Sequence, residues 1–304
     1  MFEEAVSALE EEMKLFPNNN EAKKNYINLL SMKNKSFKKD GKHQIQSLDL
    51  NDLNKSLELA NKFFMDGNFN KGVDLYEKLI NTYNNYSIDL LAMLYDKYQI
   101  LEKNNADRYT LYQSHFYDFC INPNSKVLDI GSGNIPFRYA TFLADISVDE
   151  DDYGRAGKPF VKLKEKPAIQ CDIEKLPFKD KEIDFVYCSH VLEHSKNPDK
   201  ACKEIIRIAK RGFIEVPTRA KDMLLNTAKQ SNHKWAIDLV NNTLVFTKYS
   251  EKDIKGIKTN LLMSMHVNPQ TKREKAFSAL LYLRADFFNV MLLWENSFKY
   301  KIYG

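Results

Sequence analysis

The chain has 304 residues, of which 43% are hydrophobic, 28% are charged and 12% are aromatic. This length and mix suit about two domains with packed cores, and they exclude collagen-like, low-complexity and wholly disordered proteins. With 45 basic and 41 acidic side chains, the formal net charge is only +4. So small an excess gives no reason to expect a nucleic-acid partner.

The N-terminus, the longest apolar stretch and the cysteines all favour a cytoplasmic protein. Residues 1–5 are acidic and lack the apolar core of a signal peptide. The late apolar stretch at 277–294 is interrupted by Arg284 and Asp286, so no membrane span is expected. The four cysteines have neither C-x-x-C pairing nor metal-ligand spacing, which is typical of reduced thiols.

Residues 1–108 have apolar side chains at helical spacing, which predicts an all-α domain. A repeat relates the segment that starts at Phe2 to the one that starts at Phe69, an offset of 67 residues and close to two tetratricopeptide periods. The segment 59–69 resembles the first helix and turn of such a repeat, and Gly72 would let paired helices approach. A generic helical bundle is the alternative. Either arrangement offers a surface for a protein partner.

Residues 109–304 change to short apolar runs that alternate with turns and helices, which predicts a second domain. A helix should begin at the cap Asn197 with Pro198 in its first turn, and end at Gly212. Such alternation favours an α/β fold with a doubly wound, mostly parallel sheet. The expected strands are 126–130, 140–145, 168–172, 183–189 and 213–216.

Two further strand pairs are expected late in the chain. Extended runs on either side of Asn241 and Asn242 predict a β-hairpin insertion near 235–248. The apolar tail, residues 288–303, should supply the final strand pair of the fold.

The first strand of the second domain runs into a glycine turn, Asp129-Ile-Gly131-Ser132-Gly133-Asn-Ile-Pro136. In a doubly wound sheet this turn lies at the carboxyl edge, where ligands bind, and glycines let the backbone approach them. A dinucleotide site would need a third glycine where Pro136 stands. The Asp129 carboxylate would repel a diphosphate, so it suits a ligand that carries an ammonium or a sulfonium.

With Leu176-Pro-Phe178 and His190-Val-Leu-Glu-His194, this turn resembles the class I S-adenosylmethionine-dependent methyltransferase superfamily, in its type 11-like branch. The resemblance covers residues 122–217 firmly. It implies a Rossmann-like fold, S-adenosyl-L-methionine as the cofactor and a small-molecule or glycan-type acceptor.

The resemblance also implies which residues bind the cofactor. The glycine turn would hold the methionine end, Asp145 the ribose hydroxyls and Asp172 the adenine amine. The helix that normally follows the turn looks absent, which leaves Asp149 as an alternative to Asp145. The full set implied is Asp129, Gly131, Ser132, Gly133, Asp145, Asp172, Ile173, Ser189 and His190.

Methyl transfer depends mainly on alignment of the acceptor, although a hydroxyl acceptor also needs a base. His190 and His233 are the candidate bases, and for His190 a cofactor-packing role is equally open. His194 is expected to order its loop. Trp235 and Arg219 are the expected substrate contacts, with burial at the base of the hairpin as the alternative for Trp235.

The motif from His190 to His194 also fits H-x-x-E-H, an inverted zinc-peptidase signature. That chemistry needs both histidines on one helical face. His190 instead ends a predicted strand, and Pro198 limits any helix to about a turn, so no metal site is expected.

A second class of function stays open on the sequence. Helical repeats commonly bind partners, so the chain could be an interaction module whose methyltransferase domain is inactive. The intact cofactor motifs count against this alternative. The missing first helix and the lack of a clear catalytic signature count for it.

Overall fold

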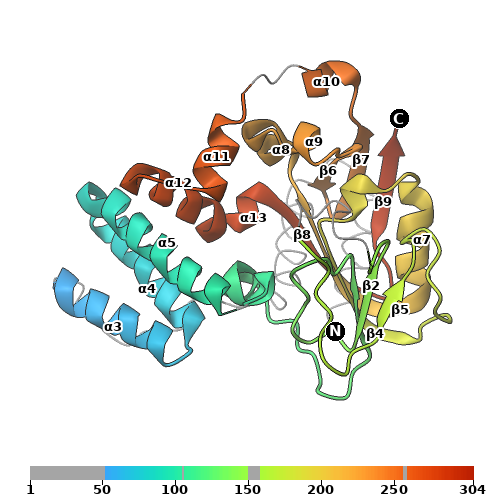
Figure 1. Ribbon diagram of the computed structural model, residues 1–304, viewed down its shortest axis with the longest axis horizontal. Helices are drawn as coiled ribbons and strands as arrows, with labels where there is room; N and C mark the ends of the chain where they lie inside the picture. Colours follow the sequence, from blue (N-terminus) through green and yellow to red (C-terminus); the bar gives the residue numbers. More distant parts are fainter. Residues whose placement is uncertain (1–51, 105, 150–157, 256–258) are drawn as a thin grey trace, which may run out of the picture.

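The computed structural model describes residues 52–304 except 105, 150–157 and 256–258. Figure 1 shows helices gathered on one side of a sheet that is capped by a smaller sheet. The repeat copy that starts at Phe2 lies outside the described residues. The 67-residue period, the tetratricopeptide type of the helices and the domain division at residue 108 therefore stay predictions.

Helices α3 (Leu53–Met65) and α4 (Phe69–Thr82) form a tight pair. The turn between them passes through Gly67, whose φ of +73° is easily reached by glycine. At Gly72 an added Cβ would lie 2.6 Å from the Phe64 ring, so the close approach of the two helices requires a residue without a side chain. Helix α5 (Ser87–Lys103) packs beside α4 and completes the helical layer.

A helix from the far end of the chain joins this layer. Helix α12 (Lys272–Leu283) packs along α5, so two helices that are far apart in sequence lie side by side (Figure 1). The rings of Tyr98 and Tyr282 are 5.2 Å apart at their centroids. Lys272 is 2.5 Å from Asp89, an ion pair at the exposed edge of this contact.

The main sheet has the order β3-β2-β1-β4-β5-β8, and only β8 is antiparallel to its neighbour. The predicted doubly wound, mostly parallel α/β sheet is confirmed. Its strands are β1 (Val127–Ile130), β2 (Phe142–Asp145), β3 (Ala168–Gln170), β4 (Ile183–Ser189), β5 (Ala209–Pro217) and β8 (Asn289–Glu295).

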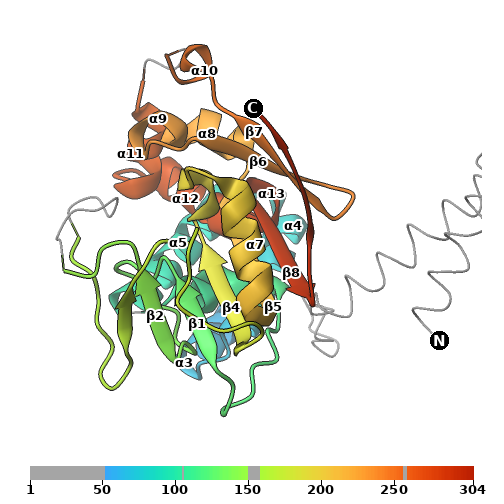
Figure 2. The same ribbon diagram turned by 90° about the vertical axis from the view of Figure 1, so that its right-hand side faces the viewer.

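The two faces of this sheet bury different layers, because successive side chains of a strand point to opposite faces. Leu128 and Val186 face helix α7 (Pro198–Ile208), which lies across the sheet in Figure 2. Val127 and Tyr187 face the helical layer. The main sheet is therefore the middle layer of the molecule.

A second sheet of three strands has the order β6-β7-β9. Strands β6 (Trp235–Val240) and β7 (Thr243–Lys248) form an antiparallel hairpin across Asn241 and Asn242. Strand β9 (Lys299–Tyr303) pairs with β7 in parallel. The expectation that the tail forms one strand pair is wrong, because β8 and β9 belong to different sheets.

The predicted end of helix α7 is also wrong. The helix ends at Ile208 and strand β5 begins directly at Ala209, which places Gly212 inside the strand. An added Cβ on Gly212 would lie 2.9 Å from the Trp294 ring and 2.5 Å from the Val186 carbonyl oxygen. The glycine thus makes room for Trp294 on β8. The local sequence around the end of a helix cannot show such a contact.

The remaining helical elements are short and connect the layers. In the described part of the chain no helix has the length and hydropathy that crossing a membrane would require. The short elements are η1 (Asn84–Tyr86), η2 (Tyr109–Gln113), α6 (Ser114–Phe116), η3 (Leu192–His194), α8 (Arg219–Leu225), α9 (Thr227–Gln230), α10 (Glu251–Lys255), α11 (Leu261–Val267) and α13 (Ala285–Phe288).

Candidate active site

The glycine turn after β1 is held by the end of β2. The N–H groups of Gly131 and Ser132 donate to the Ala144 carbonyl oxygen at 2.8 and 3.1 Å. The N–H of Gly133 donates to the Asp145 carboxylate at 3.0 Å. The turn predicted to bind the methionine end and the carboxylate predicted to bind the ribose are therefore one connected unit at the carboxyl edge of the sheet.

Asp145 and its alternative Asp149 lie in different surroundings. Asp145 is the last residue of β2, and its carboxylate also accepts from the Ser147 N–H at 3.2 Å. Asp149 is exposed and pairs with Lys162 at 3.0 Å. Of the two, only Asp145 contacts the glycine turn directly among the hydrogen bonds of the described residues.

Gly131 has a reason to be glycine that the sequence did not reveal. Its φ is +69°, and an added Cβ would lie 2.2 Å from Cγ2 of Val191. Val191 belongs to the loop after β4, so two loops at the carboxyl edge of the sheet pack directly on each other. The glycine is required by this neighbour as well as by the backbone conformation.

Asp129 is 2% exposed and lies beside the turn. Burial raises the pKa of its carboxyl group to about 7, although the Phe137 N–H donates to the carboxylate at 2.8 Å. No helix forms between β1 and β2, and the Phe137 ring instead stacks on Tyr187 with 4.1 Å between centroids. An aromatic layer thus takes the place of the helix whose absence the sequence indicated.

Asp172 and Ile173 follow β3 and lie next to Asp145. The N–H of Cys171 donates to the Asp145 carbonyl oxygen at 2.9 Å, which joins the ends of β2 and β3. The Asp172 carboxylate accepts from the Glu174 N–H at 2.9 Å and so stabilises a turn. The Ile173 side chain is buried in the core beneath the sheet edge.

A buried carboxylate, Glu215 of β5, is the centre of a network that the sequence analysis did not anticipate. The side chain is fully buried, and it accepts from the Ser189 hydroxyl at 2.9 Å and the Tyr112 hydroxyl at 2.7 Å. Asn289 of β8 donates to it at 2.5 Å, and Gln113 is a further donor. Four elements therefore meet at one carboxylate, because a buried charge needs several hydrogen bonds.

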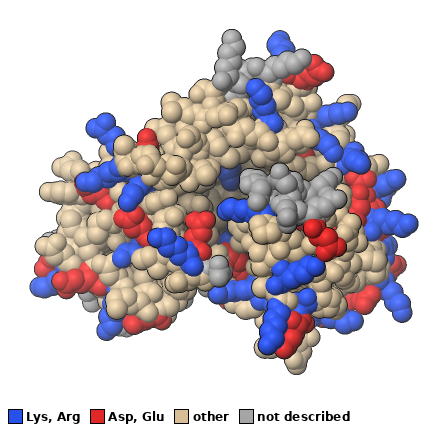
Figure 3. Space-filling model, in the orientation of Figure 1, with Lys and Arg blue, Asp and Glu red and all other residues tan. Residues whose placement is uncertain are grey.

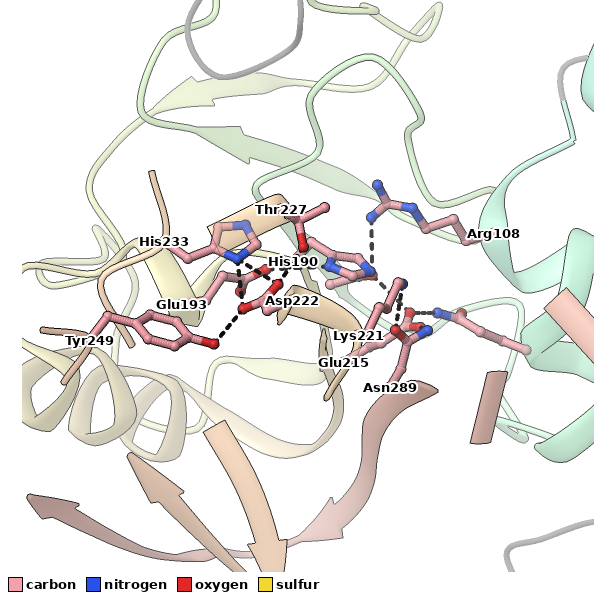
Figure 4. A network of polar contacts seen from close by, with 12 residues as sticks. Arg108, His190, Glu193, Glu215, Lys221, Asp222, Thr227, His233, Tyr249 and Asn289 are labelled. Atoms are coloured by element: carbon pink, nitrogen blue, oxygen red, sulfur yellow. Dashed lines mark hydrogen bonds and ion pairs between the residues drawn. The ribbon is translucent and has the colours of Figure 1, made fainter. Parts of the chain in front are cut away.

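Two cationic side chains border this network (Figure 4). Arg108 donates to the Ser189 hydroxyl at 3.1 Å, and Lys221 of α8 donates to the Asn289 side-chain oxygen at 2.7 Å. Burial lowers the pKa of Lys221 from its ordinary value, although the Glu215 charge opposes this shift. Ser189, predicted to lie beneath the cofactor, is thus fixed from both sides by charged neighbours.

His190 lies at the end of β4 in a left-handed conformation with φ of +57°. Its backbone N–H donates to the Glu215 carbonyl oxygen at 2.8 Å, and its Nδ1 lies 3.3 Å from the Glu193 carboxylate. Burial and the nearby Arg108 charge lower the pKa of His190 well below the ordinary value. The ring keeps 21% of its surface exposed, so a ligand can reach it.

His233, the other candidate base, is buried beside Asp222 of α8. Its Nδ1 lies 3.0 Å from both carboxylate oxygens. Burial disfavours the charged ring, yet the hydrogen bond with Asp222 raises the pKa of His233 overall. Tyr249 and Thr227 donate to the same carboxylate at 2.9 and 2.6 Å, which fixes it in place.

The two predicted substrate contacts lie in unlike positions. Trp235 is 8% exposed, and its indole N–H donates to the Ser195 carbonyl oxygen at 2.9 Å. Its ring packs near Phe246 within the hairpin, which matches the alternative of burial at the hairpin base. Arg219 begins α8, and its guanidinium lies 5.8 Å from the centre of the Tyr249 ring.

The structure brings most of the predicted residues to one edge, and the surface is hollowed between the helical layer and the sheet (Figure 3). The polar residues of the Glu215 network, which the sequence did not predict, lie mainly outside the motifs. Glu215 could have been suspected, because a carboxylate inside an apolar strand is unusual. Arg108, Tyr112, Lys221 and Asn289 gave no local signal.

The central part of the chain matches a known family. Residues 128–214 match the family model described as "Methyltransferase domain". A segment of 93 residues is 39% identical to the uncharacterized protein MJ1123 from Methanocaldococcus jannaschii. That match covers 30% of this chain and 42% of the relative, so the chain matches less than half of the relative's length.

Solved structures give similar matches. The YcgJ protein from Bacillus subtilis is 18% identical, with coverage of 39% of this chain and 65% of that one, and a TM-score of 0.30. A SAM-dependent methyltransferase from Thermotoga maritima is 19% identical, with coverage of 52% of this chain and 70% of that one, and a TM-score of 0.29.

Proposed function

We propose, for a chain that contains a class I methyltransferase domain over residues 128–214, that the protein transfers a methyl group from S-adenosyl-L-methionine to a small-molecule or glycan-type acceptor. The observation that carries this proposal is the unit formed by the glycine turn, Asp129 and Asp145. Gly133 donates to Asp145 at 3.0 Å, and Asp129 is buried directly before the turn.

The charge of these residues fits the cofactor. A buried carboxyl group with its pKa raised to about 7 is stabilised as an anion when a cation binds beside it. S-adenosyl-L-methionine carries a sulfonium and an ammonium, whereas a dinucleotide would bring a diphosphate. Asp129 would face the methionine end, and Asp145 would accept from the ribose, because one carboxylate oxygen can accept more than one hydrogen bond.

The bound cofactor supplies an electrophilic methyl group on a good leaving group. What remains for the protein is to align the acceptor and exclude water, and such positioning accounts for much of the acceleration in reactions of this kind. Ser189, which would lie beneath the cofactor, is held in place by hydrogen bonds with Glu215 and Arg108. For a hydroxyl acceptor, His190 is our candidate base because its ring is partly exposed at the strand end.

The binding test uses two aspartate variants of the full chain and isothermal titration with S-adenosyl-L-methionine. Asp145→Asn removes a charge from the turn unit and should weaken binding about 10- to 100-fold, the range of a charge-assisted hydrogen bond. Asp149→Asn is the matched control, because Asp149 is exposed and pairs with Lys162, and it should bind as the wild type does. Equal affinity of wild type and Asp145→Asn would refute the placement of the cofactor.

Turnover distinguishes the two classes of function. The wild type is incubated with methyl-labelled cofactor and fractions of a cell extract, and the products are identified by mass spectrometry. A labelled small molecule or glycan precursor supports the proposal. Tight cofactor binding without any labelled product would favour the inactive interaction module instead.

A further inference from the structure

A cluster of potential metal ligands lies beside the candidate active site. Glu193, His194 and His233 each offer one ligand atom, and these three atoms lie within 4.8 Å of one another. Glu193 and His194 come from the single turn η3, whereas His233 precedes β6. The N–H of Lys234 donates to the Glu193 carbonyl oxygen at 2.8 Å, which fixes the two segments against each other.

Glu193 carries the first sign that the cluster can bind a cation. Its side chain is 1% exposed, and one carboxylate oxygen is buried without a hydrogen-bond partner among the described residues. The other oxygen lies 3.3 Å from Nδ1 of His190. A buried carboxylate with one oxygen left without a partner is energetically costly. A cation at the free oxygen would remove this cost.

His233 is oriented in the way that metal-bound histidines usually are. Its Nδ1 faces the Asp222 carboxylate at 3.0 Å, which leaves Nε2 as the nitrogen available to an ion (Figure 4). This is the carboxylate–histidine arrangement that fixes the ring and its tautomer in metal sites. The Tyr249 hydroxyl and the Thr227 hydroxyl hold Asp222 in turn.

His194 completes the set. Its ring stands nearly perpendicular to that of His233, at an interplanar angle of 84° and 4.7 Å between centroids. A neutral imidazole keeps a lone pair for coordination, so His194 can supply one ligand atom to the cluster.

From this geometry we propose that Glu193, His194 and His233 bind a divalent transition-metal ion, with Asp222 as the residue that positions His233. Two imidazoles and one carboxylate suit Zn²⁺ and the other divalent first-row transition metals, whereas Mg²⁺ and Ca²⁺ prefer oxygen ligands. In a tetrahedral Zn²⁺ site with bonds of about 2.1 Å, ligand atoms lie about 3.4 Å apart. The three atoms, which lie within 4.8 Å of one another, would therefore have to approach each other by at most about 1.4 Å. The remaining coordination positions would be open to water or a ligand.

The proposed site differs from the peptidase site that the H-x-x-E-H motif suggested. In a peptidase both histidines of the motif would be ligands, but here the His190 ring contacts the Glu193 carboxylate. The third ligand instead comes from His233. The proposal concerns this chain's affinity for a metal and does not depend on methyl transfer.

The test measures metal binding directly. Full-length protein is stripped with a chelator and titrated with Co²⁺, whose visible spectrum reports its coordination, and then with Zn²⁺ in a calorimeter. We expect one equivalent to bind. His194→Gln and Glu193→Gln should each weaken it at least about 10-fold, and Asp222→Asn about 10- to 100-fold, as outer-shell changes do.

The matched control is His266→Gln, which removes a histidine that contacts Ser278 rather than the cluster. It should bind metal as the wild type does. A rise in Tm with Zn²⁺ that is present in wild type and His266→Gln but lost in His194→Gln gives a second readout, and it also shows whether each variant folds. Absence of saturable binding at about 1 mM metal, or equal binding by wild type and His194→Gln, would overturn the proposal.

Discussion

The charge on one buried carboxyl group sets how the proposed cofactor site responds to pH. Asp129 is almost completely buried, and burial raises its pKa to about 7 in the absence of a ligand. A cation bound beside it favours the ionised form and lowers this pKa. Binding therefore releases a proton whenever the free protein starts with Asp129 protonated.

The affinity for S-adenosyl-L-methionine should rise with pH and level off above about pH 7. Below that value the slope should approach about tenfold in Kd per pH unit, because one proton is lost on binding. Calorimetric titrations of wild type and Asp129→Asn across about pH 5.5 to 8 measure it. The asparagine variant should show weaker and much flatter binding, and an equal slope in both proteins would contradict the role of Asp129.

A second prediction at this scale concerns the contact between the glycine turn and the loop after β4. Gly131→Ala places a methyl group 2.2 Å from Cγ2 of Val191 and forces a left-handed alanine. We expect it to lower the free energy of unfolding by about 2–4 kcal/mol, as strain and overpacking combine.

A double-mutant cycle isolates the steric part. Val191→Ala removes the colliding methyl group, so it should recover at least about 1 kcal/mol in the Gly131→Ala background, measured by urea denaturation. Strictly additive effects of the two substitutions would show that the turn moves rather than collides.

Among the elements, the α3–α4 pair shows how a helix-breaking residue can be the better choice. In isolation, Gly72→Ala would favour helix α4 by about 1 kcal/mol. In the folded protein the new Cβ would lie 2.6 Å from the Phe64 ring. The packing of two elements therefore opposes the preference of one.

We expect Gly72→Ala to destabilise the protein by about 1 kcal/mol, the opposite sign to its helix propensity. Phe64→Leu in the same background should restore part of the loss, since a smaller side chain vacates the space. Urea denaturation followed by circular dichroism gives the sign directly. A stabilised Gly72→Ala variant would show that the ring moves away without cost.

At the scale of the whole molecule, hydrogen bonds to Glu215 connect the helical elements to the main sheet. Its carboxylate accepts from Tyr112 of η2, which contacts α5 and α12 of the helical layer, and from Ser189 and Asn289 in the main sheet. Helix α12 strengthens the same connection, because it packs along α5 although it lies between β7 and β8 in sequence. The helical layer and the sheet should therefore unfold together.

Glu215→Leu should cost about 3–5 kcal/mol, because it leaves the hydroxyls and side-chain amides that donate to this carboxylate buried without their acceptor. Glu295→Gln, at an exposed position on β8, is the control and should change stability by less than about 0.5 kcal/mol. The wild type should show one transition by both circular dichroism and tryptophan fluorescence. Loss of helix before the fluorescence change would show that the helical layer is independent.

Local patterns were sufficient to predict a mostly parallel α/β sheet and the approximate positions of its first five strands. Strand β4 has the predicted bounds of Ile183 and Ser189, whereas β5 begins at Ala209, four residues before the expected start. The glycine turn was readable too, because its chemistry lies within a few consecutive residues. The assignment of individual cofactor and substrate contacts stays a prediction.

Local sequence patterns gave wrong predictions where the conformation of a residue depends on a contact with a residue distant in sequence. Gly212 was taken as a helix end, yet it makes room for Trp294 of β8. The tail strands were expected to pair, yet register with β5 and β7 separates them. In both cases the deciding contact lies far along the chain.

The sequence by itself determined the parallel sheet, its glycine turn and the acidic character of the proposed cofactor site, because hydrophobic periodicity and turn chemistry are local. Only the tertiary structure decided the Glu215 network and the meeting of Glu193, His194 and His233. Folding brings buried charges and metal ligands together with their partners, and the spacing of these residues along the chain does not determine the distances between them.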